Sequence, residues 1–144
     1  MAAKAKKLVG NMIIAQSGGP TVVINQSLVG AVLEARKHKE IKKVFGSLHG
    51  LKGILEENLI DLGKETAANL ELVANTPASA LGSVRKKPTP EDCKKVFEVL
   101  KKYDIRYFFY IGGNDSAETT HIVNEAAIAA GYQMKCFHIC KTID

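Results

Sequence analysis

The sequence has no tryptophan, and aromatic residues make up only 6% of its 144 residues. It lacks the array of aromatic residues on strands that RNA-binding domains use, and it shows no helix-turn-helix spacing. The net charge of +5 suits any polyanion, including a phosphorylated metabolite. The lysines fall in short clusters, which are typical of solvated surfaces. We therefore expect no nucleic acid among the partners of this protein.

Cysteine is also scarce. Cys93, Cys136 and Cys140 give an odd count without a disulfide framework. No secretory signal opens the chain, and no apolar run is long enough to span a membrane. We expect a cytoplasmic protein that has no membrane partner.

Two of these cysteines flank a histidine near the end of the chain. Cys136, His138 and Cys140 alternate within an apolar run, so a strand would place all three side chains on one face. A second pair of ligands at zinc-like spacing is missing from this run. We interpret the three residues as the core of a buried strand, with metal binding as the alternative.

Short apolar runs alternate with helical patterns along the chain. Strands are expected at 12–15, 44–48, 107–111 and 134–139, and helices at 24–35, 65–74, 89–100 and 116–130. A loop or turn is expected at 49–53. Because the strands are apolar throughout, this order predicts an α/β fold, a Rossmann-like three-layer domain with a mostly parallel sheet. We expect one domain over 11–144, after a basic and flexible segment at 1–10.

Three polar motifs follow predicted strands, and parallel strands bring such motifs to one edge of a sheet. Ser17-Gly18-Gly19 lacks the Walker lysine, so it is either a structural turn or a backbone approach to phosphate. Asp115 in Gly112-Gly113-Asn114-Asp115-Ser116 is either a helix cap or a functional carboxylate. Asp144, three positions after Lys141, is either a turn residue or a base for phosphoryl transfer.

Four motifs together resemble those of phosphofructokinases. They occur in the family's order and span nearly the whole chain: Ser17-Gly18-Gly19-Pro20 with Asn25, Leu81-Gly82-Ser83-Val84-Arg85, Gly112 to Ser116, and Lys141-Thr142-Ile143-Asp144. The chain is identified as a member of that family on these motifs. The resemblance implies magnesium-dependent (Mg2+) transfer of a phosphoryl group to the 1-hydroxyl of fructose 6-phosphate. It also implies that the fold is the N-terminal, donor-binding half of a phosphofructokinase.

The resemblance carries roles onto individual residues. The phosphate donor would be held by the backbone of Gly18, Gly19 and Gly113 and by the guanidinium of Arg85. Asp144 would be the base that activates the sugar hydroxyl, and Thr142 would contact the sugar phosphate. The family's magnesium-associated aspartate falls on Asn114, a neutral and weaker ligand.

Two positions bear on the identity of the donor. ATP-type members carry glycine where this chain has Asp115 and Lys141, whereas pyrophosphate-type members resemble this chain. A carboxylate at 115 would repel the α-phosphate of ATP, and an ammonium at 141 would stabilise the transferring phosphates. We expect pyrophosphate as the donor, with an ATP-dependent enzyme as the alternative.

The family pattern continues beyond Asp144 into a second domain that carries most of the sugar-phosphate site. We therefore expect this chain to be the donor-binding part of a homo-oligomeric enzyme, a dimer or tetramer, and to be inactive alone. Two alternatives come from other classes: a non-catalytic phosphate- or nucleotide-binding module, and a basic nucleic-acid-binding α/β domain.

Overall fold

Five strands form one sheet in the order β3-β2-β1-β4-β5. The computed structural model describes residues 7–19, 21–84 and 88–141. The strands are β1 (Gly10–Gln16), β2 (Ile41–Ser47), β3 (Leu59–Asp61), β4 (Ile105–Gly112) and β5 (Lys135–Cys140). All neighbouring pairs are parallel except β2 and β3, which are antiparallel. The predicted α/β class with a mostly parallel sheet is confirmed.

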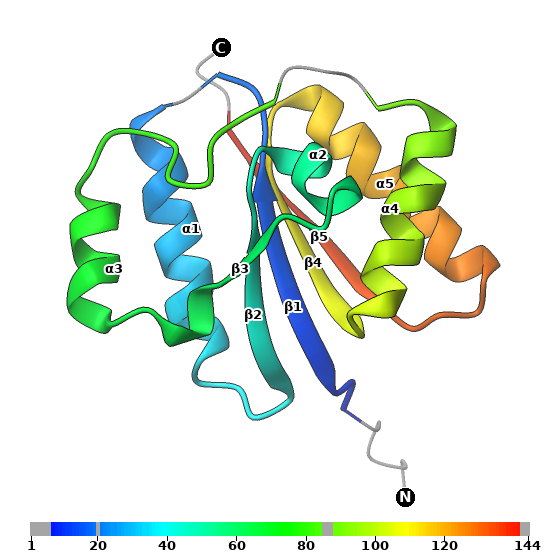
Figure 1. Ribbon diagram of the computed structural model, residues 1–144, viewed down its shortest axis with the longest axis horizontal. Coiled ribbons are helices and arrows are strands. Elements are labelled where there is room, and N and C mark those ends of the chain that lie inside the picture. Colours follow the sequence, from blue (N-terminus) through cyan, green and yellow to red (C-terminus); the bar gives the residue numbers. More distant parts are fainter. Residues whose placement is uncertain (1–6, 20, 85–87, 142–144) are drawn as a thin grey trace, which may run out of the picture.

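Helices cover both faces of the sheet, as predicted. They are α1 (Val22–Ala35), α2 (Gly50–Leu55), α3 (Ala67–Ala74), α4 (Pro90–Lys102), α5 (Asn114–Ala129) and the short 3-10 helix η1 (Leu62–Lys64). In Figure 1, α1 and α3 lie on one side of the sheet, and α2, α4 and α5 lie on the other. No helix within the described residues has the length and apolarity needed to cross a bilayer.

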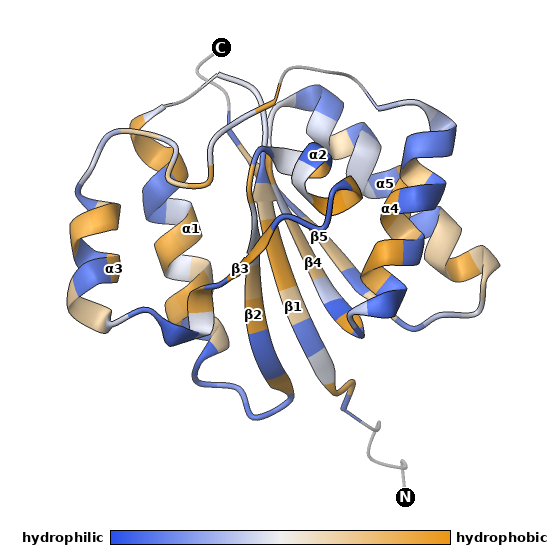
Figure 2. Cartoon of the chain, viewed as in Figure 1, coloured by the Kyte–Doolittle hydropathy of each residue, from blue (hydrophilic) through white to orange (hydrophobic). Residues whose placement is uncertain are grey.

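The central strand β1 contributes side chains to two hydrophobic cores, one on each face of the sheet. Met12 and Ile14 pack with α1 on one face, whereas Ile13 and Ala15 pack with α2 and α4 on the other. Alternate side chains of a strand point to opposite faces, so a strand between two helical layers is apolar at every position. Figure 2 shows this apolar character along the middle of β1 and β2.

Helix α4 shows how local sequence sets an element boundary. Thr89 Oγ1 accepts a hydrogen bond from the Asp92 backbone N–H at 3.2 Å, and the Thr89 N–H donates to Asp92 Oδ2 at 3.0 Å. This capping box satisfies two backbone donors, and Pro90 occupies the first helical turn, where it is tolerated. The predicted start of this helix is confirmed.

The prediction of a loop at 49–53 was wrong, because helix α2 begins at Gly50. His49 caps it in the left-handed conformation, at φ 60°, and Gly50 follows at φ 62°. Leu51 and Ile54 are buried three positions apart, which is helical spacing. The two glycines of this segment are typical of a turn, so the helix was not predicted. Strand β3 was also missed, because three residues are too few for periodicity to register.

The prediction of a buried strand at 134–139 was wrong in one respect. β5 is an edge strand of this sheet, with β4 as its neighbour on one side. Cys140 is exposed, and 44% of Phe137 is exposed. An apolar run therefore predicted the strand correctly but not its place in the sheet.

Candidate active site

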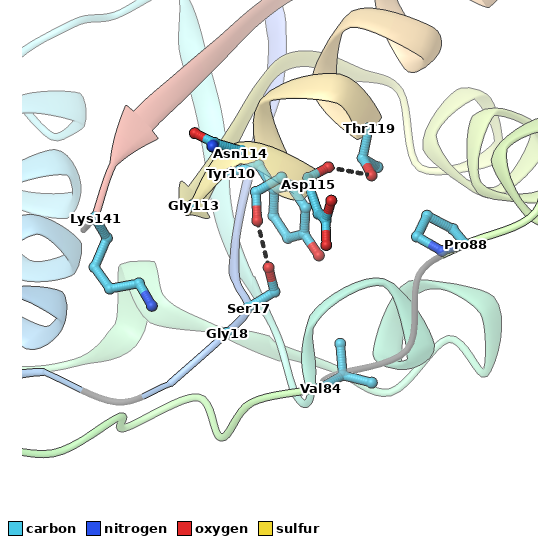
Figure 3. Close-up of a pocket in the computed structure, with 11 residues that line it drawn as sticks. Ser17, Gly18, Val84, Pro88, Tyr110, Gly113, Asn114, Asp115, Thr119 and Lys141 are labelled. Carbon is cyan, nitrogen blue, oxygen red and sulfur yellow. Dashed lines mark hydrogen bonds between the residues drawn. The ribbon is translucent and has the colours of Figure 1, made fainter. Parts of the chain in front are cut away.

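A pocket of about 280 Å³ lies where β1, β4 and β5 end. Figure 3 shows how side chains from these three strand ends and from α5 face it. Its lining comprises Ser17, Gly18, Val84, Pro88, Tyr110, Gly113, Asn114, Asp115, Ser116, Thr119 and Lys141. The expectation that the three motifs meet at one edge is confirmed for their described residues.

The turn after β1 runs close to the start of α5. The hydroxyls of Ser17 and Ser116 form a hydrogen bond, and the Ser17 N–H donates to Ile111 O at 2.9 Å. Gly112 permits this approach, because a Cβ at that position would lie 2.0 Å from Ser116 Oγ. Gly18 adopts φ 82°, a left-handed conformation that glycine accepts without strain.

The N-terminus of α5 faces the pocket. Gly113 is the helix N-cap, so Asp115 is a residue of the first turn rather than the cap. Figure 3 shows the carboxylate of Asp115 directed into the pocket and the Asn114 side chain directed away from it. Thr119 Oγ1 donates to the Asp115 carbonyl at 2.9 Å. The positive end of a helix attracts anions, whereas the Asp115 carboxylate attracts a cation.

Lys141 closes the opposite wall. Its backbone N–H donates to Gly112 O at 2.9 Å, which extends the pairing of β5 with β4 by one residue. Its ammonium donates to the carbonyl oxygen of Gly19 at 2.8 Å. A carbonyl is a neutral partner, so this hydrogen bond holds the ammonium at the glycine turn without a countercharge from Gly19.

Tyr110 reaches the pocket from β4, and sequence reasoning missed it. The residue is 3% exposed, and burial raises the pKa of its hydroxyl, while a hydrogen bond with Ser17 opposes part of that rise. The phenol is therefore neutral at pH 7. Its position in an aromatic run directly before Gly112 was the available signal, because the end of a parallel strand borders the ligand edge.

The structure brings together Gly18, Gly113, Asn114, Asp115 and Lys141 among the predicted site residues. Gly19 borders the pocket through the carbonyl that Lys141 contacts. The other predicted residues lie outside the described ranges: Pro20, Arg85, Thr142 and Asp144.

The donor atoms of the pocket fit a magnesium ion that arrives with phosphate. Asp115 supplies a carboxylate and Ser17 and Thr119 supply neutral oxygens nearby, whereas the Asn114 amide is directed away from them. Within residues 7–19, 21–84 and 88–141, no three His, Cys, Asp or Glu side chains are grouped to hold a metal. Magnesium commonly takes one or two carboxylates, several waters and substrate phosphates, so a dedicated cage is not needed.

Comparison with known proteins agrees with this geometry. The model of the Phosphofructokinase family matches residues 11–144. The chain belongs to the phosphofructokinase family. A solved phosphofructokinase, the pyrophosphate-dependent enzyme from Nitrosospira multiformis, superposes with a TM-score of 0.88 and 40% identity, over 94% of this chain and 34% of that one.

Curated phosphofructokinases are similar in sequence as well. The pyrophosphate–fructose 6-phosphate 1-phosphotransferase of Rhodospirillum rubrum is 56% identical over 135 residues, which are 94% of this chain and 33% of that protein. The enzyme of the same name from Xanthomonas campestris is 45% identical over 140 residues, with 94% and 33% covered. The chain thus spans about a third of the length of the curated phosphofructokinases that it matches.

Proposed function

We propose that this chain is the donor-binding part of an enzyme that transfers a phosphoryl group from pyrophosphate to the 1-hydroxyl of fructose 6-phosphate. The observation that carries the proposal is that Asp115 and Lys141 line opposite walls of one small pocket. The names of the similar enzymes support the same donor and acceptor.

Asp115 and Lys141 select the donor by charge. A carboxylate directed into the pocket repels a third phosphate group, which ATP has and pyrophosphate lacks. The ammonium of Lys141, held at the glycine turn by the Gly19 carbonyl, offsets the charge of the two phosphates that remain. The resemblance places Gly18, Gly19 and Gly113 at the donor phosphates. Gly113 brings the N-terminus of α5 to the pocket, and Gly18, which has no side chain, leaves room for a phosphate at the glycine turn.

The chemical step is assigned to residues carried over by the resemblance. Asp144 accepts the proton of the sugar 1-hydroxyl while the hydroxyl oxygen attacks the phosphorus that is transferred. The bond between that phosphorus and the bridging oxygen of pyrophosphate breaks, and phosphate leaves. Arg85 offsets phosphate charge, and Thr142 contacts the sugar phosphate. Asp115 is the residue that would hold magnesium, whose chemistry would be to offset phosphate charge; Asn114, at the position that the resemblance gives to a magnesium-associated aspartate, directs its side chain away from the pocket.

The remaining features of the enzyme follow from the same proposal. We place the sugar-phosphate domain in the part of the relatives' length that this chain does not span. We expect a homo-oligomer, a dimer or tetramer, and a location in the cytoplasm. Cys93, Cys136 and Cys140 are free thiols, which suits a reducing compartment.

Calorimetry tests the donor on the 144-residue chain itself. We expect magnesium pyrophosphate to bind more tightly than magnesium ATP. Asp115→Gly should raise ATP affinity about tenfold or more, because it removes a like charge. Lys141→Gly should weaken pyrophosphate binding. Glu125→Gln is the matched control, because Glu125 is an exposed acid of the same helix and should change neither affinity.

Turnover is tested in the full-length protein with fructose 6-phosphate. Asp144→Ser should remove most of kcat and leave pyrophosphate binding nearly intact, because it deletes the base and not the phosphate site. Equal losses of binding and rate would count against the role of Asp144. A preference for ATP in the unmodified protein would refute the donor assignment.

A further inference from the structure

A buried asparagine holds the loop that precedes Arg85. Asn25 lies on α1 and is 1% exposed. Its Nδ2 donates to Thr76 O at 2.9 Å, and its Oδ1 accepts the Ala80 N–H at 2.8 Å. One side chain therefore joins both ends of a five-residue turn to the helix. Its removal would take away the partner of the Thr76 carbonyl and of the Ala80 N–H and so release both ends of the turn from α1.

The rest of this loop is tied to β1 and to the start of α2. Gln16, which is fully buried, donates from Nε2 to Gly82 O at 3.1 Å. The His49 N–H donates to Leu81 O at 2.8 Å, and the Leu81 side chain fills the core at 1% exposure. The loop over 76–84 is therefore fixed against the sheet, although it contains no regular element.

The same loop is joined to the glycine turn of the pocket. The Gly18 N–H donates to Val84 O at 3.3 Å, and Ser83 Oγ donates to Gly18 O. Val84 and Gly18 both line the pocket. Both backbone polar groups of Gly18 are thus occupied by the loop that Asn25 holds.

We propose that Asn25 is a positioning residue for the phosphate-binding turn. It fixes the loop over 76–84, and through Ser83 and Val84 it sets the position of Gly18 at the pocket. Asn25 itself bonds to the loop at Thr76 and Ala80, so its effect on Gly18 is indirect. The consequence for pyrophosphate rests on the proposed function, whereas the coupling of Asn25 to Gly18 does not.

Amide hydrogen exchange in the 144-residue chain, followed residue by residue by NMR, tests this coupling. In Asn25→Ala, the Ala80 N–H should exchange faster because its acceptor is gone. The Gly18 N–H should also exchange faster, by about tenfold, because its loop partner is released. The N–H of Ile13, a fully buried residue of the central strand β1, is the reference for global opening. Faster exchange at Ala80 with unchanged exchange at Gly18, relative to this reference, would overturn the proposal.

Two further variants keep the test decisive. Ser83→Ala removes one of the two bonds between the loop and the turn, the one from Ser83 Oγ to Gly18 O, and keeps the bond from the Gly18 N–H to Val84 O. Because that weaker-held turn opens more often, exchange at Gly18 should be faster and exchange at Ala80 unchanged; an unaffected Gly18 would overturn the proposal even where Asn25→Ala does not fold. Val32→Ala truncates another fully buried residue of α1 and controls for general loss of stability. It should leave Gly18 unchanged relative to the reference amide, and equal effects in Val32→Ala and Asn25→Ala would refute a positioning role.

Pyrophosphate titration separates this inference from the proposed function. Asn25→Ala and Ser83→Ala should each weaken binding about tenfold, whereas Val32→Ala should leave the affinity unchanged. Failure of the unmodified chain to bind pyrophosphate would refute the proposed function and leave the exchange result at Gly18 to decide the coupling. Binding that is equally tight in all variants would refute the positioning of the phosphate-binding turn.

Discussion

Replacing Gly112 with alanine is expected to destabilise the protein by about 2 kcal/mol, because it forces β4 and α5 apart. Gly112 is the last residue of β4, directly beneath the first turn of α5. An added Cβ would lie 2.0 Å from Ser116 Oγ, 2.7 Å from Ser116 Cβ and 3.0 Å from Ser17 Oγ. Rotation of the Ser116 side chain relieves the first contact only.

The magnitude follows from the second contact. Carbon atoms pack at roughly 3.5–4.0 Å, so the helix start must move by on the order of 1 Å. Overpacking of this size costs about 1–3 kcal/mol, and loss of the Ser17 to Ser116 hydrogen bond adds about 1 kcal/mol. Alanine recovers roughly 0.5–1 kcal/mol of backbone entropy. The net loss is therefore about 2 kcal/mol in the free energy of unfolding.

Urea unfolding of a double-mutant cycle measures this clash. Ser116→Gly removes both Ser116 atoms that the new Cβ would meet. Gly112→Ala with Ser116→Gly should therefore be more stable than the sum of the single changes by about 3 kcal/mol, because the clash is relieved and the shared hydrogen bond is lost once instead of twice. Gly30→Ala is the matched control, because nothing lies within 4 Å of its added Cβ. It should stabilise the protein by roughly 0.5–1 kcal/mol, since Gly30 lies inside α1.

Additive effects within about 0.5 kcal/mol would refute the steric argument, because independent sites add within that range. The pocket provides a second check. If the first turn of α5 moves, Asp115 moves with it, and Gly112→Ala should also weaken ligand binding. Normal binding together with normal stability would show that the close approach at Gly112 is not required.

Two further predictions concern elements away from the pocket. Thr89→Ala should lower the free energy of unfolding by about 1 kcal/mol, because it removes the side-chain cap of α4; urea titration measures it, and an unchanged midpoint would contradict it. Burial raises the pKa of the Cys136 thiol from 9.0 to about 11. The folded protein therefore favours the neutral thiol, so stability present below pH 9 should fall as the pH rises towards 11, and Cys136→Ala should remove that part of the loss. At pH 8, iodoacetamide should modify exposed Cys140 before Cys136, and the reverse order in peptide mapping would contradict the assigned burial.

The parts of the fold that the sequence predicted are those with local causes. The run from Tyr107 to Ile111 is apolar because β4 is covered on both faces. The run therefore predicts a strand even when the neighbouring strands and helices are not known. Thr89 and Pro90 mark the start of α4 through contacts within one turn. Glycines after β1 and β4 mark turns that must approach other segments.

The features that were missed depend on distant partners. β5 is at the edge because of which strands pair, and no property of Phe137 or Cys140 reports that. Tyr110 enters the pocket through the register of β4 against β1, where it pairs with Ala15. The sequence marked Asn25 as part of a motif, but its contacts with Thr76 and Ala80 exist only once the loop over 76–84 has folded onto α1. Tertiary contacts, not propensity, decide these positions.

The Lys141 to Gly19 hydrogen bond spans 122 residues of sequence, and the Ser17 to Ser116 bond spans 99. Contacts between such distant positions form slowly, because a long loop must close before either bond is gained. The pocket therefore forms only when β1, β4 and β5 have assembled. During synthesis, the wall of the pocket that Lys141 forms exists only once β5 has paired with β4. The glycine turn is therefore made long before the pocket is. A ligand that needs Lys141 recognises only chains whose sheet is complete, and its binding stabilises the whole sheet rather than one loop.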